Sequence, residues 1–149
     1  RLSVDLAKYR ALVLEEATEH LAEMSRALLA LEKDPSSGEA IDEVFRMAHS
    51  IKGMAGSLGY DALTELSHAL EDRMERVRSA GRVEGGEAGL PPLFRGLEGL
   101  EAMVAHVRDT GEAPLADPAL AAELAAEGVA EPAEVTGDPE PDPKKAPTP

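Results

Sequence analysis

The sequence predicts an all-α protein, an up-down antiparallel four-helix bundle. Apolar residues recur every three or four positions in four long stretches, which is the period of a helix that is buried on one side. Short segments rich in Gly or Pro separate these stretches, and none of them shows the alternating pattern of a strand. Because short connections make successive long helices antiparallel neighbours, the four helices are expected to close into a bundle.

The first two predicted helices have recognisable signals at their ends. The first covers residues 5–33 and is ended by Pro35, which cannot continue a helix. Ser36 and Glu39 have the spacing of a capping box, in which each side chain satisfies a free backbone N–H at the start of a helix. The second helix is therefore expected to begin there and to end at Gly59.

The third and fourth helices are delimited in the same way. Asp61 is a good N-cap for the third helix, which Gly81 is expected to end. Pro91 and Pro92 fit the first turn of the fourth helix, where a missing N–H costs nothing, and Gly111 follows its last apolar residue.

The composition of the chain changes after Gly111. Residues 112–149 hold 8 of the 11 prolines, nine acidic residues and two basic ones. Such a segment buries too little apolar surface to fold on its own. We therefore predict a bundle domain over 1–111 and an acidic, Pro- and Ala-rich linker over 112–149 that is largely disordered. A short fifth helix is expected within it, over about 117–127.

Composition also excludes several classes of protein. With 29 acidic against 15 basic residues the net charge is −14, which argues against binding to nucleic acid or to an anionic membrane. Without cysteine there is no disulfide, thiolate metal site or cysteine nucleophile. No apolar run is long enough to span a membrane, and no signal peptide precedes the first helix, so a cytoplasmic protein is expected.

The second helix carries an unusual group of residues on one face. His49 and Lys52 are three positions apart, and Gly53 and Gly56 follow on the same side of the helix. Glycine costs a helix interior about 1 kcal/mol relative to Ala, so two on one face need a reason. Either the surface is kept bare so that a partner can approach the histidine, or a neighbouring helix packs closely there. The spacing alone favours neither.

The third helix carries a second polar pair, His68 and Glu71, again three positions apart. In an antiparallel hairpin that turns at Tyr60, positions whose numbers sum to 120 lie opposite each other. His49 is therefore expected to face Glu71, and Lys52 to face His68, within about one residue.

This arrangement suits a histidine that accepts a phosphoryl group. A carboxylate that accepts one ring N–H leaves the other nitrogen free to attack, so Glu71 would orient His49. Lys52 could neutralise charge on an incoming phosphoryl group. There is no G-x-x-x-x-G-K-S/T loop and no acidic cluster for Mg²⁺ beside His49, so we expect no ATP site and no bound cofactor in this chain.

Two other interpretations remain open on the residues alone. A surface His beside a Glu is commonly a weak polar pair, which would leave a non-catalytic helical adaptor or structural bundle. Glu65 and His68 have the Glu-x-x-His spacing of di-iron bundles, but such a site needs a second copy that the chain lacks, so no metal is expected.

The same residues resemble a known family. The run from Phe45 to Tyr60, FRMAHSIKGMAGSLGY, is similar to the phosphorylation motif of histidine-phosphotransfer (Hpt) domains. With LSHALE over 66–71, it resembles in particular the N-terminal Hpt domains of CheA-type chemotaxis kinases. The similarity covers about residues 5–111. It implies that His49 is the phosphoacceptor and Glu71 its hydrogen-bond partner, that Lys52 and His68 are supporting polar residues, and that Gly53 marks the close-approach surface.

The resemblance also implies partners. In such two-component phosphorelays the phosphoryl group comes from ATP through a separate kinase domain, usually in the partner protomer of a dimer. It then passes to an aspartate on the receiver domain of a response regulator. The kinase and receiver domains bind the ATP and Mg²⁺, so this chain alone is expected to be a monomer without kinase activity.

Overall fold

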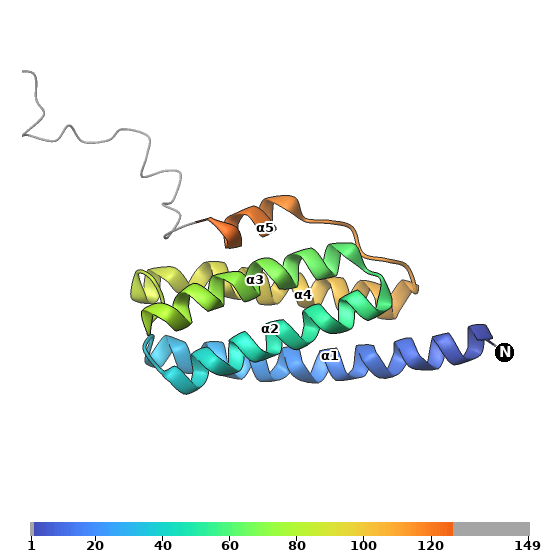
Figure 1. Cartoon of the computed structure of the whole chain (residues 1–149), viewed down its shortest axis with the longest axis horizontal. Helices are drawn as coiled ribbons and strands as arrows, with labels where there is room; N and C mark the ends of the chain where they lie inside the picture. The colour runs from blue at the N-terminus through green and yellow to red at the C-terminus, as the bar shows by residue number, and fades with distance from the viewer. Residues whose placement is uncertain (1, 127–149) are drawn as a thin grey trace, which may run out of the picture.

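The computed structural model describes residues 2–126, and in that range every regular element is helical (Figure 1). The helices are α1 (Leu2–Lys33), α2 (Gly38–Leu58), α3 (Asp61–Ala80), α4 (Leu90–Thr110) and α5 (Pro118–Ala125), with a short 3-10 helix, η1 (Gly86–Gly89), before α4. This confirms the predicted all-α fold class. The acidic tail lies outside the described residues from 127 onwards.

Helices α1 to α4 form the bundle, and α5 lies along one side of it (Figure 1). Within the described chain, α2 packs against α1 and α3, while α4 contacts both α1 and α3 and so closes the bundle. The N-terminal part of α1 projects beyond the other helices (Figure 1). The largest fully buried side chains come from all five helices and form one continuous core: Met24, Leu28, Leu31, Ile41, Val44, Ile51, Leu66, Leu70, Met74, Leu93, Leu100 and Leu124.

Most helix ends lie where the sequence predicts them. Gly59, Gly81 and Gly111 end α2, α3 and α4 with φ of 76°, 80° and 73°, a left-handed conformation that only glycine adopts without strain. The two prolines occupy the first turn of α4. No helix of the described chain is both long and apolar enough to cross a membrane.

Two predicted N-caps were wrong. Ser37, not Ser36, caps α2, because its Oγ accepts the N–H of Ala40 at 3.3 Å. Ser36 instead binds within the loop before α2, where both its N–H and its hydroxyl donate to Asp34 Oδ1. Asp61 is the first residue of α3 rather than its cap, and its charge there complements the helix dipole.

The fifth helix exists and is attached to the bundle. Asp117 caps it by accepting the N–H of Leu120, and Leu124 is fully buried. Leu124 packs against Gly96 of α4, where a β-carbon would lie 3.2 Å from its Cδ1. Arg73 on α3 is only 4% exposed, and its guanidinium donates to the carbonyls of Glu123 and Leu124. The packed helices thus extend past residue 111 to the end of α5.

Candidate functional site

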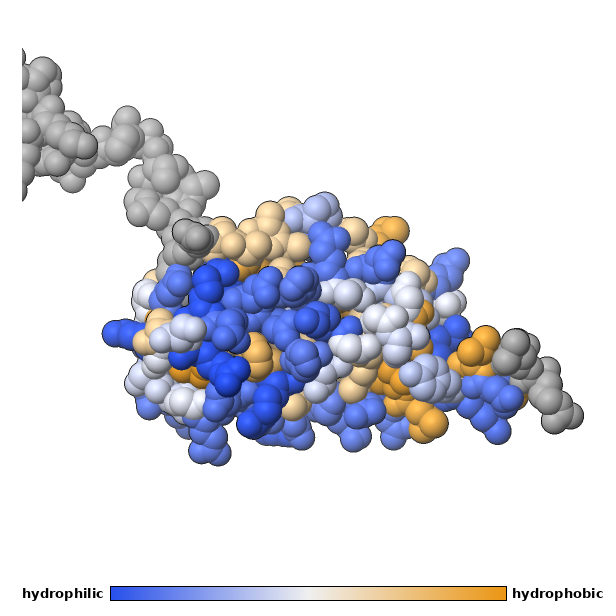
Figure 2. Space-filling model, in the orientation of Figure 1, coloured by the Kyte–Doolittle hydropathy of each residue, from blue (hydrophilic) through white to orange (hydrophobic). Residues whose placement is uncertain are grey.

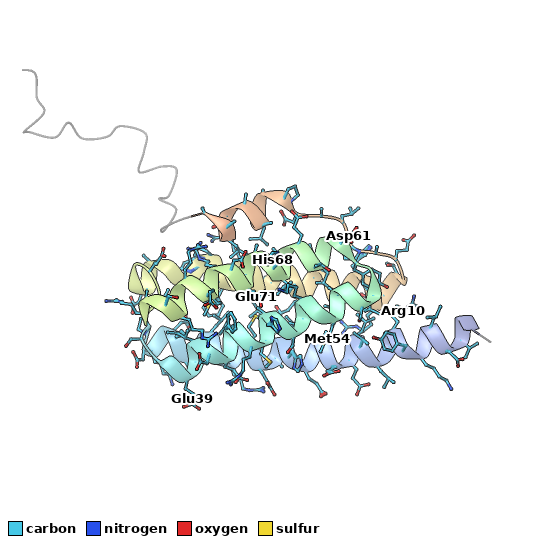
Figure 3. All side chains as sticks on the ribbon, in the orientation of Figure 1. Arg10, Glu39, Met54, Asp61, His68 and Glu71 are labelled. Atoms are coloured by element: carbon cyan, nitrogen blue, oxygen red, sulfur yellow. The ribbon has the colours of Figure 1, made fainter. Side chains whose placement is uncertain are left out.

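The α2–α3 hairpin brings His49 and Glu71 together, as the register predicts. His49 Nδ1 and Glu71 Oε2 form a hydrogen bond across the two helices. Glu71 lies where α2 and α3 meet (Figure 3), with only 9% of its side chain exposed, whereas 64% of the His49 side chain is exposed. The histidine is therefore presented to solvent while its partner is held in the protein.

The proton of this hydrogen bond belongs to the histidine. Burial by itself would raise the pKa of Glu71, but hydrogen bonds from Lys52 and His49 outweigh it and hold the pKa below its ordinary value. An ionised carboxylate only accepts hydrogen bonds, so Nδ1 of His49 must donate. In the neutral ring, Nε2 then carries the free lone pair.

Lys52 binds Glu71 rather than His68. Its Nζ donates to Oε1 of the carboxylate at 2.5 Å, so the two oxygens of Glu71 accept from two different residues of α2. The sequence predicts that Lys52 faces His68, but a hairpin register describes only the backbone positions. The long side chain of Lys52 reaches the carboxylate of Glu71, three residues further along α3. Glu71 is thereby fixed from both sides.

His68 lies on the solvent side of α3. Its Nε2 is 3.4 Å from Asp72 Oδ2 in an exposed pair within the helix. His68, Glu71 and Asp72 offer ligand atoms within 4.8 Å of one another, which is close enough for a metal ion. Both oxygens of Glu71 are already engaged, however, so a cation here would compete with Lys52 and His49.

Gly53 and Gly56 form an open part of the α2 surface. A β-carbon built on either glycine meets nothing within 4 Å, and both residues are exposed. Close packing of a neighbouring helix, one of the two interpretations left open by the spacing, is therefore wrong for the described chain. Around the C-terminal part of α2 the surface is pale to orange, whereas the part of this face over the other end of α2 and α3 is mostly hydrophilic (Figure 2).

One feature beside His49 was missed by the sequence analysis. The ring of Phe45 lies nearly parallel to the imidazole, with centroids 6.4 Å apart and 13° between the planes. Arg78 of α3 places its guanidinium carbon 4.5 Å from the centroid of the Phe45 ring. The spacing of four between Phe45 and His49 could have indicated the first contact, but nothing local indicates the second.

The sequence was compared with protein-family models and with known proteins. A family model described as the Hpt domain matches residues 8–110. The chain is 36% identical over 104 residues to the chemotaxis protein CheA of Halobacterium salinarum, and 37% identical over 109 residues to that of Bacillus subtilis. These matches cover 70% and 73% of this chain but only 15% and 16% of the relatives, so the chain spans a small part of their length.

Solved structures agree with this assignment. The CheA phosphotransferase domain from Thermotoga maritima is 30% identical to this chain, with a TM-score of 0.60. That match covers 68% of this chain and 95% of the other. The phosphorylated P1 domain of CheA3 from R. sphaeroides, solved in complex with CheY6, is 26% identical with a TM-score of 0.68. That match covers 78% of this chain and 92% of the other.

Proposed function

Because the chain belongs to the Hpt domain family and is a phosphotransfer module similar to that of CheA, we propose a role for each residue of the site. His49 accepts a phosphoryl group that a separate kinase domain takes from ATP, and passes it to an aspartate of a response regulator. The observation that carries the proposal is the bond between the buried Glu71 carboxylate and Nδ1 of an exposed His49, which leaves Nε2 free.

The chemistry follows from that hydrogen bond. The Nε2 lone pair attacks the γ-phosphorus, the N–P bond forms, and the bond from phosphorus to the bridging oxygen of ADP breaks. Nδ1 keeps its proton, so the ring becomes positively charged, and the negative charge of Glu71 stabilises it. In the second step an aspartate oxygen of the receiver attacks the phosphorus, and the N–P bond electrons return to Nε2.

Lys52 and His68 have supporting roles in this scheme. Lys52 holds Glu71 ionised and in place through its hydrogen bond to Oε1. Because Lys52 is one turn from His49, its charge also lowers the cost of bringing a phosphoryl group near the carboxylate. His68 lies on the same helix as Glu71 and adds positive charge to this face when it is protonated.

The partners in this proposal are proteins. A structural neighbour, the phosphorylated P1 domain of CheA3, is a complex with CheY6, which supports a response regulator as the acceptor. The open surface at Gly53 and Gly56 gives such a receiver room to approach His49. ATP is bound by a separate kinase domain, and the isolated chain is a monomer without kinase activity of its own.

The test is to incubate the chain with ATP, Mg²⁺ and the kinase core of a CheA-type protein, and to locate the phosphate by peptide mass. We expect acid-labile, base-stable phosphate on the peptide that contains His49, and none in the His49→Gln variant. His20→Gln, on α1, is the matched control and should be labelled like the wild type. Equal labelling of His49→Gln would overturn the proposal and favour a non-catalytic adaptor.

A further inference from the structure

Phe45 stacks on the phosphoacceptor from the preceding turn of α2. Its ring and the His49 imidazole have centroids 6.4 Å apart and planes 13° from parallel, which is an offset-stacked arrangement. Phe45 is half-buried and packs against the hydrophobic core, so its own ring has a fixed position. His49 thus lies against a rigid aromatic face.

Phe45 is in turn held from the neighbouring helix. The Arg78 guanidinium lies over the Phe45 ring at 4.5 Å from its centroid, a cation–π distance. Asp42, one turn before Phe45 on α2, forms an ion pair with Arg78, with Oδ1 3.1 Å from Nε. The contact therefore joins α3 to α2 through a guanidinium that is fixed both by a carboxylate and by an aromatic ring.

The imidazole needs a second constraint besides Glu71. A single hydrogen bond at Nδ1 fixes one edge of the ring but lets the ring turn about the line that joins the two atoms. With 64% of its side chain exposed, His49 has little other packing to prevent that rotation. Stacking on Phe45 defines the plane of the ring. The hydrogen bond and the stack together define the direction of the Nε2 lone pair.

We propose that Phe45 is a positioning residue for phosphoryl transfer and that Arg78 supports it from α3. The inference rests on the proposed function, since it concerns the direction from which Nε2 attacks. Both side chains would act through the orientation of the imidazole, which Phe45 contacts and Arg78 supports. They affect the fraction of time that His49 is aligned for in-line transfer. A small misalignment of the nucleophile lowers the reaction rate strongly.

The test compares Phe45→Leu with Phe45→Tyr in the full chain. Leu keeps the apolar bulk and removes the ring, whereas Tyr keeps the ring. With the kinase core, we expect kcat for phosphorylation of Phe45→Leu to fall about tenfold at unchanged KM, and Phe45→Tyr to restore it. The ring-current shift of the His49 imidazole protons in the NMR spectrum should disappear in Phe45→Leu and persist in Phe45→Tyr.

Arg78→Gln tests the same stack at an exposed position, where unfolding is not expected. Its kcat should fall less than that of Phe45→Leu. Arg46→Gln is the matched control, because it removes an exposed arginine that pairs with Glu43 on the same helix. A wild-type kcat for Phe45→Leu, with its ring-current shift lost, would overturn this inference alone. Absence of phosphate from His49 in the wild type would overturn the proposed function as well.

Discussion

At the scale of single residues, Glu71 is the most constrained polar group of the site. It is 7% exposed, and its two oxygens accept from His49 and Lys52. In Glu71→Gln one oxygen becomes an NH₂ group that faces a donor, so we expect the free energy of unfolding to fall by about 1–3 kcal/mol. Phosphorylation should slow because the amide no longer fixes the tautomer of His49. Urea unfolding and initial labelling rates measure the two effects, and an unchanged rate would contradict the role given to Glu71.

The same carboxylate makes stability depend on pH. Hydrogen bonds from Lys52 and His49 hold the pKa of Glu71 in the folded protein below its ordinary value, so the unfolded chain binds the proton more readily. The stabilisation is complete above the unfolded pKa of about 4.3, and it is lost as the pH falls through the lower pKa of the folded protein.

We therefore expect the difference in unfolding free energy between wild type and Glu71→Gln to shrink as the pH is lowered from about 7 to about 3. Urea denaturation at a series of pH values measures it. A difference that stays constant over the whole range would mean that Glu71 is not an ionised, stabilising group in the folded protein.

At the scale of helices, a substitution on the open surface of α2 at Gly53 is expected to change stability and phosphoryl transfer in opposite directions. A β-carbon at Gly53 meets nothing within 4 Å, so Gly53→Ala should stabilise the helix by up to about 1 kcal/mol. If a receiver approaches His49 across this surface, the added methyl group should slow phosphoryl transfer. Thermal unfolding and transfer from the phosphorylated chain to a receiver measure the two effects.

Gly89→Ala is the matched control for that substitution. A β-carbon there would overlap the backbone carbonyl oxygen of Glu84, so the variant should lose stability instead. If Gly53→Ala were more stable and transferred at the wild-type rate, the glycine would have no role in the approach of a partner.

The helix ends and the main contact of the site could be predicted from sequence because both depend on local chemistry. Glycine and proline fix where helices stop, and the short turn at Tyr60 fixes the register that places His49 against Glu71. The partner of Lys52 could not be predicted, because it depends on side-chain reach. The burial of Arg73 depends on carbonyls fifty residues away, which no local pattern indicates.

At the scale of the whole molecule, the packed structure includes α5, although composition changes earlier, at Gly111. Removing α5 would uncover Gly96 and its surroundings on α4 and would leave the buried Arg73 guanidinium without the α5 carbonyls it binds. We propose that residues after Ala126 act as a linker.

A chain that ends at 126 should therefore unfold at the same temperature as the full chain. A chain that ends at 111 should be less stable by several kcal/mol, because burial of Leu124 alone contributes about 2–5 kcal/mol. Differential scanning calorimetry of the two shortened chains checks this. Equal melting temperatures would show that α5 contributes nothing to the fold and that the domain ends at Gly111.

The measurement that tests the central claim most directly is the position of phosphorus on the imidazole. The chain, with ¹⁵N-labelled histidine, is phosphorylated by a CheA-type kinase core and examined by ¹H–¹⁵N and ³¹P NMR. Because Glu71 holds the proton on Nδ1, the ³¹P coupling should appear on Nε2 of His49, with Nδ1 still protonated. Phosphorus on Nδ1, or on any residue other than His49, would contradict the account.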